Sequence, residues 1–148
     1  MINQITEIEI SYRPLLSKKG RKKILSSKDA YSIFNSIWNK NLIEYQEQFW
    51  LLLLNRANEV IGSRCMFTGG VSGTVVDIKM ILGLALKCNA TGIIIAHNHP
   101  SGNLSPSNAD LQLNKKLKSA TKQVDIQLID NLIVTLNGYT SFADEGCL

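Results

Sequence analysis

The sequence predicts a single α/β domain in which a mixed β-sheet is flanked by helices. Short apolar runs rich in β-branched residues, typical of buried strands, are interspersed with segments whose apolar residues recur at helical spacing. The chain has 148 residues, of which 45% are hydrophobic and 19% are charged. These values suit one folded domain with one core.

Each expected element follows from its own pattern. Apolar runs or alternation predict strands at residues 7–12, 49–54, 59–67, 92–96, 126–136 and 139–142. Helical spacing of apolar residues predicts helices over residues 26 or 27 to 38, 77 to 89, and 110 to about 123. The strand at 126–136 is expected to bend at Asp130 and Asn131. We assign residues 1–25 to an N-terminal strand and basic loop, and residues 26–148 to the domain proper.

The stretch that follows the buried strand at 92–96 carries the chemistry of the chain. His97 and His99 point to the same side if the strand continues through them, because side chains alternate along a strand. Asp110 arrives near the start of the next helix. Two histidines and one carboxylate are a set of three protein ligands, and a catalytic zinc typically takes three and leaves a fourth position for water.

A purely structural interpretation of the same stretch is also available. A histidine on an apolar strand is commonly a core residue, and Ser105 before Pro106 can be a helix N-cap with proline at the first helical position. Alternatively, Ser107 and Asp110 can form a capping-box variant. The metal interpretation is favoured because the only two histidines of the chain lie two residues apart, directly after a buried strand.

These motifs resemble a known family. His-x-His-Pro at 97–100 with Ser-x-x-Asp at 107–110 resembles the metal-binding signature of the JAMM (MPN-type) metalloproteases. The fuller string His-Asn-His-Pro-Ser-Gly-Asn is similar to the bacterial RadC-like branch, long labelled "DNA repair protein RadC". The resemblance covers about residues 26–148, a RadC-like JAMM/MPN metallohydrolase domain, and includes the segments at 49–55, 67–70 and 139–146.

The resemblance implies a fold, a cofactor and a reaction. The fold would be a JAMM/MPN-like, cytidine-deaminase-like mixed sheet with flanking helices. His97, His99 and Asp110 would hold Zn²⁺, and the zinc would polarise the carbonyl of an amide or isopeptide bond. Ser107 would donate its hydroxyl to the developing oxyanion.

The resemblance also implies a general base just before a core strand. RadC-like chains carry it in the pattern Glu-x-Phe-x-Leu-Leu-Leu-Asn, which matches Glu47. Glu44 is the neighbouring alternative. Glu47 would take a proton from the water and pass it to the leaving amine. The substrate would be an unidentified peptide or protein.

This chain departs from the family pattern in two places. RadC-like proteins often have an upstream helix-hairpin-helix DNA-binding region, and we expect none here because the chain begins too late for one. Asn131 stands where the family often has histidine, which removes a possible polar group behind the metal ligands.

The basic run from Lys18 to Lys23 leaves a second function open. It is interpreted as a solvated loop, and the alternative is a weak DNA contact, which the net charge of +4 permits. The competing hypothesis is therefore a DNA-associated binding module with a structural or vestigial metal site. The sequence does not specify an oligomeric state.

Three widely spaced cysteines without a Cys-x-x-Cys pair predict reduced thiols and a cytoplasmic protein. We expect no membrane association, because no signal peptide is recognisable and the longest apolar run, at 49–54, is too short to span a bilayer.

Overall fold

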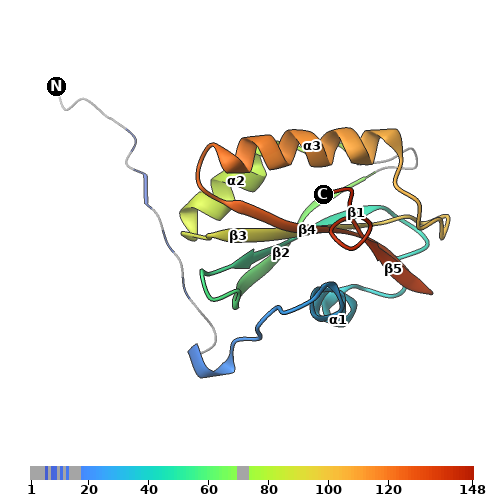
Figure 1. The fold of residues 1–148 in the computed structure, drawn as a ribbon, viewed down its shortest axis with the longest axis horizontal. Coiled ribbons are helices and arrows are strands. Elements are labelled where there is room, and N and C mark those ends of the chain that lie inside the picture. The colour runs from blue at the N-terminus through green and yellow to red at the C-terminus, as the bar shows by residue number, and fades with distance from the viewer. Residues whose placement is uncertain (1–5, 7, 10, 12, 14–17, 70–73) are drawn as a thin grey trace.

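Five strands form one mixed sheet in the computed structural model, which describes residues 6, 8, 9, 11, 13, 18–69 and 74–148 (Figure 1). The strands are β1 (Gln48–Leu54), β2 (Val60–Thr68), β3 (Gly92–Asn98), β4 (Gln127–Thr135) and β5 (Gly138–Ser141). Their order is β2-β1-β3-β4-β5, in which β3 and β4 are parallel and all other neighbours are antiparallel. The predicted α/β class with a mixed sheet is confirmed.

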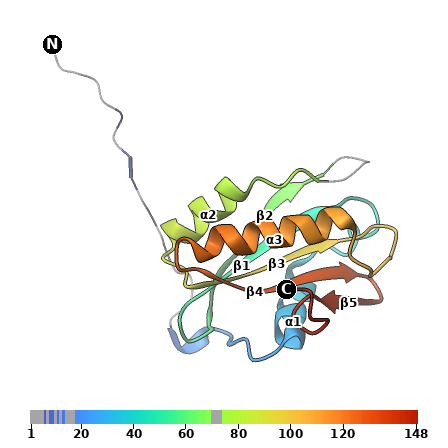
Figure 2. The same cartoon turned by 45° about the horizontal axis from the view of Figure 1, so that its top comes forward.

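Helices cover both faces of this sheet. They are α1 (Ser27–Ile37), α2 (Ile78–Lys87) and α3 (Asn108–Lys122), and a short 3-10 turn, η1, covers Lys18–Gly20. Helix α1 lies on one face, while α2 and α3 lie on the other (Figures 1 and 2). Apart from the strand predicted at 7–12, the predicted helices and strands differ from the observed ones by at most two residues at each boundary.

Strand β1 shows why the central strands read as continuous apolar runs. Leu52 and Leu54 belong to the buried cluster under α1, whereas Leu51 and Leu53 belong to the cluster under α2 and α3. Strands buried on both faces need apolar residues at every position. The same alternation on β3 directs His97 to the α3 face, with Ile93 and Ile95, and Asn98 to the α1 face.

Strand β4 is irregular one residue before the predicted bend. Ile93 pairs with Leu128, and its neighbour Ile94 pairs with Asp130. Ile129 is therefore an extra residue on β4, which is a β-bulge, and such a residue bends its strand. The polar pair Asp130 and Asn131 within the apolar run suggests a bend, but the exact residue at which β4 bulges depends on its pairing with β3.

A buried carboxylate ties β4 to the turn that follows β5. The Ser141 hydroxyl donates to Asp130 Oδ2 at 2.6 Å, and the backbone N–H of Ala143 donates to Asp130 Oδ1 at 3.0 Å. Asp130 is only 4% exposed, and burial raises the pKa of its carboxyl, against the hydrogen bonds that lower it. Asp130 therefore holds the C-terminal segment by hydrogen bonds, although burial disfavours its charged form.

The segment before α1 lies beside the start of β2. Lys23 forms an isolated antiparallel bridge with Glu59, and the Ile24 N–H donates to the Asn58 carbonyl at 2.9 Å. Of the strand predicted at 7–12, residues 8, 9 and 11 are described and are not in a strand, and the other three lie outside the described residues. No helix in the described part of the chain is both long enough and apolar enough to cross a membrane.

Candidate metal centre

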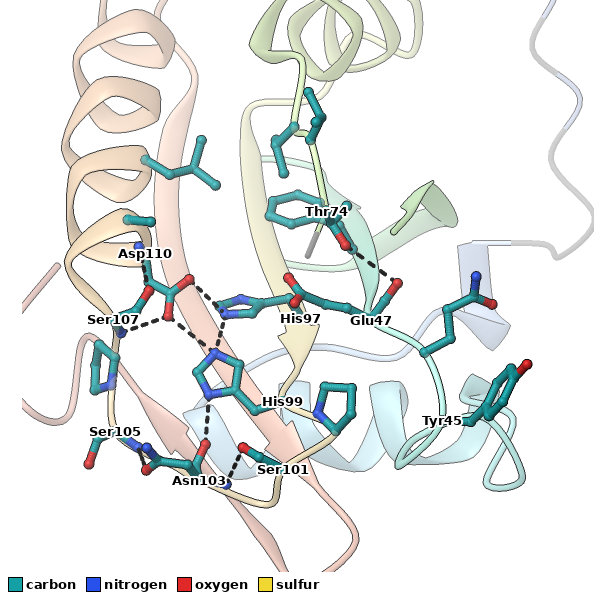
Figure 3. A pocket seen from close by; sticks show the side chains of 18 residues that line it. Tyr45, Glu47, Thr74, His97, His99, Ser101, Asn103, Ser105, Ser107 and Asp110 are labelled. Atoms are coloured by element: carbon teal, nitrogen blue, oxygen red, sulfur yellow. Dashed lines mark hydrogen bonds and ion pairs between the residues drawn. The ribbon is translucent and has the colours of Figure 1, made fainter. Parts of the chain in front are cut away.

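The two histidines lie at the end of β3, beneath the start of α3 (Figure 3). The His99 N–H donates to the Val134 carbonyl at 3.3 Å, so pairing with β4 continues one residue past the strand. Both imidazoles consequently point to the same face, and their Nε2 atoms lie 3.0 Å apart. The predicted convergence of the two rings is present in the structure.

Asp110 reaches the same point from the first turn of α3. Its Oδ1 lies 3.1 Å from His97 Nε2, and its Oδ2 lies 3.2 Å from His99 Nε2. Figure 3 shows the three side chains facing one another across the gap between β3 and α3. The cluster joins one strand end to one helix start, two elements whose separation depends on the packing of α3 over the sheet.

The first turn of α3 settles which serine caps the helix. Ser107 is the N-cap: its Oγ accepts from the Asp110 N–H at 3.1 Å, and its own N–H donates to Asp110 Oδ2 at 2.8 Å. This is the capping-box alternative. The Ser105 alternative is wrong, because Pro106 precedes the helix instead of opening it. Asp110 is thus both a cap residue and a member of the cluster.

The donor set fits a tetrahedral zinc ion. Zinc binds imidazole nitrogen and carboxylate oxygen at about 2.0–2.1 Å, which sets neighbouring ligand atoms about 3.3 Å apart in a tetrahedron. Here the two Nε2 atoms are 3.0 Å apart, and each lies close to a different Asp110 oxygen, His97 at 3.1 Å from Oδ1 and His99 at 3.2 Å from Oδ2. With one ligand atom taken from each residue, the three atoms lie within 4.8 Å of one another. Two imidazoles and one carboxylate are also the ligand types of catalytic zinc sites. His97, His99 and Asp110 could therefore hold a metal ion.

A hydrogen bond behind His99 selects the tautomer that a metal requires. Its Nδ1 lies 2.6 Å from the Asn103 carbonyl oxygen, which can only accept, so Nδ1 carries the proton in the neutral ring. The lone pair then lies on Nε2, toward Asp110 and His97. Phe49 stacks on the His97 ring at 6.4 Å between centroids and 12° between planes, and restricts the ring orientation.

Asp110 and His99 shift each other's proton affinity. The hydrogen bond to Asp110 raises the pKa of the His99 imidazole, while burial acts in the opposite direction. Burial raises the pKa of the Asp110 carboxyl, but the hydrogen bonds from His97 and His99 outweigh it and hold this pKa far below its ordinary value. Asp110 is therefore ionised at any physiological pH, which is the state that binds a metal.

The cluster opens onto a groove of about 1200 Å³. Its walls include apolar side chains, of which Val75 is 89% exposed and Tyr45 is 79% exposed. The acidic residues on the lining are Glu47 and Asp110. None of the described side chains that line it is lysine or arginine.

Glu47 lines this groove, directly before β1. Its side chain extends toward the histidines in Figure 3. After the hydrogen bond to Asp110, the charge of Glu47 is also among the influences that raise the pKa of His99, so the carboxylate lies within electrostatic reach of the cluster. The Gly69 N–H donates to the Glu47 carbonyl at 2.8 Å, and the Thr74 hydroxyl donates to it at 3.4 Å.

The neighbours of Glu47 are placed elsewhere. Glu44 is exposed and is absent from the groove lining. Gln48 belongs to the opposite face of the sheet, where its Oε1 accepts from Trp50 Nε1 at 3.4 Å. Of the two glutamates considered from the sequence, the structure brings Glu47 to the histidines.

Ser107 also lines the groove. Because its Oγ accepts from the Asp110 N–H, the hydroxyl proton remains free to donate in another direction. The Ser107 hydroxyl can therefore cap α3 and still donate a hydrogen bond into the groove.

Sequence reasoning missed two asparagines that build this site. No role in the site was assigned to Asn103 or to Asn98 from the sequence. A polar residue in an otherwise apolar buried strand was the signal for Asn98, which is 0% exposed. Asn131, noted as a departure from the family pattern, lies on β4 and donates from Nδ2 to Asn114 Oδ1 of α3 at 3.1 Å.

Fold and site together define a domain of the JAB/MPN class: a mixed α/β sheet with a His-x-His pair at one strand end and an aspartate in the next helix. The family model described as "RadC-like JAB domain" matches residues 24–147. The chain therefore belongs to the RadC-like JAB domain family.

Curated relatives carry the name "UPF0758 protein" and support this assignment. The chain is 46% identical over 125 residues to one from Flavobacterium johnsoniae, which covers 84% of this chain and 53% of the relative. It is 36% identical over 149 residues to one from Porphyromonas gingivalis, covering 99% and 64%, and 43% identical over 102 residues to one from Haemophilus ducreyi, covering 69% and 46%. The chain thus spans roughly half to two thirds of the length of these relatives.

Proposed function

We propose that this domain is a zinc-dependent hydrolase that cleaves an amide or isopeptide bond in a peptide or protein. The observation that carries the proposal is the convergence of one ligand atom each from His97, His99 and Asp110 to within 4.8 Å of one another, with Glu47 on the lining of the same groove. A purely structural ion site has no need for an acid–base group beside it, and it usually has four protein ligands.

Each of these residues has a distinct task in the proposed reaction. His97, His99 and Asp110 hold the ion, which when bound supplies a Lewis acid that polarises the substrate carbonyl and lowers the pKa of water. Glu47 takes a proton from the attacking water and returns it to the amine as the carbon–nitrogen bond breaks. Ser107 donates its free hydroxyl proton to the oxygen that gains negative charge.

The lining of the groove supports a peptide substrate over a nucleic acid. A phosphodiester chain brings one negative charge per nucleotide, and proteins that bind it neutralise these charges with lysine and arginine. The described lining provides neither, and its apolar walls at Val75 and Tyr45 suit uncharged side chains. A peptide of neutral or basic character therefore matches the groove.

The experiment measures metal content and cleavage with the same tag-free preparation. Wild type should contain one zinc per chain by mass spectrometry of the metal, and His97→Ala should lose it. Glu47→Gln should keep the zinc but cleave a random peptide library at least about 10²-fold more slowly, because the amide cannot accept the proton. Glu44→Gln is the matched control and should cleave like wild type, since that side chain is exposed and away from the groove.

Two results would contradict the proposal. One is a His97→Ala variant that retains a full equivalent of zinc. The other is equal cleavage by wild type and Glu47→Gln, which would remove the acid–base role from this residue.

DNA binding is the second candidate function, and one observation bears on it. The basic run up to Lys23 lies beside Glu59 at the start of β2, at the opposite end of the sheet from His97 (Figures 1 and 2). A DNA contact there would be separate from the groove. It predicts weak binding whose affinity falls as salt rises, and an affinity independent of salt would show that the run makes no phosphate contacts.

A further inference from the structure

Asn98 stands between the two histidines in the sequence, but its side chain lies on the opposite face of β3. This side chain is completely buried. Both the oxygen and the nitrogen of its carboxamide form hydrogen bonds with the backbone of the 43–48 segment. Its Oδ1 accepts from the Gln48 N–H at 2.7 Å, and its Nδ2 donates to the Ile43 carbonyl at 2.7 Å and to the Gln46 carbonyl at 2.9 Å. A buried amide with three short partners defines the position of the segment it binds.

These bonds begin where the main-chain ladder stops. Strands β1 and β3 pair from Leu54–Gly92 to Phe49–His97, and no further. Beyond Phe49, the Asn98 carboxamide takes over the task of holding the incoming chain to β3. Asparagine suits this position because it offers one acceptor and two donors on a short stem, whereas aspartate would set an oxygen against two carbonyls.

The two peptide groups that Asn98 binds are the ones on either side of Glu47. The Gln46 carbonyl belongs to the peptide before Glu47, and the Gln48 N–H belongs to the peptide after it. Fixing both peptides fixes the backbone direction at Glu47, and with it the direction in which the side chain leaves the main chain. The Gly69 N–H holds the Glu47 carbonyl as well.

We propose that Asn98 is a positioning residue that aims the Glu47 carboxylate at the metal centre by clamping the peptides on both sides of it. The inference rests on the proposed function, because it matters only if Glu47 acts beside a bound ion. One strand end then sets both parts of the site: His97 and His99 face the ion from one side of β3, and Asn98 sets the base from the other side.

The test loads the full tag-free chain with Co²⁺ and follows the Glu47 side chain by carbon-13 NMR. A paramagnetic ion displaces the resonances of nearby nuclei by an amount that falls with the cube of distance, so the Glu47 carboxyl signal reports how closely this group is held. The signal is assigned by its loss in Glu47→Gln.

The Asn98→Ser variant should still bind one equivalent of Co²⁺, because the hydrogen bonds of the Asn98 side chain go to the 43–48 segment and to none of the three ligands. The Glu47 carboxyl carbon should lose most of its cobalt-induced shift. Asn55→Ser is the matched control: the Asn55 side chain also makes three hydrogen bonds, to the Ala57 and Glu59 N–H groups and to the Glu59 carboxylate, at the other end of β1. This control should keep the full shift.

An Asn98→Ser variant that keeps both Co²⁺ and the full Glu47 shift overturns the positioning role. A wild-type chain that takes up no Co²⁺ instead overturns the proposed function, and the inference with it. Should Asn98→Ser fail to fold, Asn98→Asp keeps the size and the acceptor but not the donors, and the same loss of shift is expected. In the wild type, rapid solvent exchange of the Gln48 amide and the Asn98 side-chain amide would also overturn the clamp.

Discussion

Asp110→Ala should separate the capping role of Asp110, which the structure shows, from the metal-ligand role that we propose for it. The first is the cap: Asp110 Oδ2 accepts from the Ser107 N–H at 2.8 Å, and loss of a capping interaction typically costs about 0.5–2 kcal/mol. The second is the metal: an ion that binds only the folded chain stabilises it by about 4 kcal/mol when its concentration is a thousand times the dissociation constant. Without zinc, the free energy of unfolding of the variant should therefore be about 1 kcal/mol lower than that of wild type. With zinc present, the variant should also lack the extra stability that the ion gives to wild type.

The assay is urea unfolding of tag-free protein in a chelator and in buffered free zinc. Wild type should gain stability on adding zinc, and Asp110→Ala should gain none. Asn108→Ala is the control, since that residue shares the first turn of α3 but is not part of the cluster. An Asp110→Ala variant that zinc stabilises as much as wild type would refute the reasoning, because Asp110 would then not be a ligand.

The pH dependence of stability in the same assay should differ with and without zinc. In chelator, the lowered pKa of Asp110 contributes stability that is present above its ordinary value of 3.8 and is lost as pH falls. The raised pKa of His99 contributes stability that is present below its ordinary value of 6.5 and is lost as pH rises through the folded-state value. The stability gained from zinc should instead grow as pH rises and the histidines lose their protons, because the ion competes with protons for the imidazoles.

Two further predictions concern the helix cap and the buried carboxylate. Ser107→Ala should lower the free energy of unfolding by about 1 kcal/mol and keep its zinc, whereas Ser105→Ala should change neither; equal losses would argue against Ser107 as the cap. Asp130→Asn should gain stability relative to wild type as pH rises above 3.8, because burial raises the pKa of Asp130 and folding therefore favours its protonated form. A stability difference between these two proteins that does not change with pH in urea titrations would contradict that assignment.

The sequence pattern was sufficient to predict those structural features that depend only on neighbouring residues in the chain. Strands β1 and β3 are buried on both faces, so continuous apolar runs revealed them, and alternation alone predicted that His97 and His99 share a side. Glu47 was chosen over Glu44 by resemblance, and alternation explains its placement: it precedes Phe49 by two residues and so shares the face of His97.

Where two local rules applied at once, only tertiary packing could decide. Ser105 before Pro106 and Ser107 before Asp110 are both acceptable helix starts. In the structure α3 begins at Asn108, and the Asp110 carboxylate that closes the Ser107 capping box also contacts the two imidazoles. Asn98 lay beyond prediction for a related reason: its partners are 50 to 55 residues away in the chain, and no local pattern contains them.

The shared use of Asp110 has a consequence for how the metal centre forms. Because the Ser107 N–H and both histidines already bind this carboxylate, its oxygens are oriented before an ion arrives. An ion bound here would find the three side chains already gathered within 4.8 Å of one another, so little ordering entropy would oppose its binding. The cost is competition from protons, since the contacts that orient the ligands also raise the pKa of His99. If the cluster binds a metal, its affinity should therefore fall as pH decreases and His99 takes up its proton.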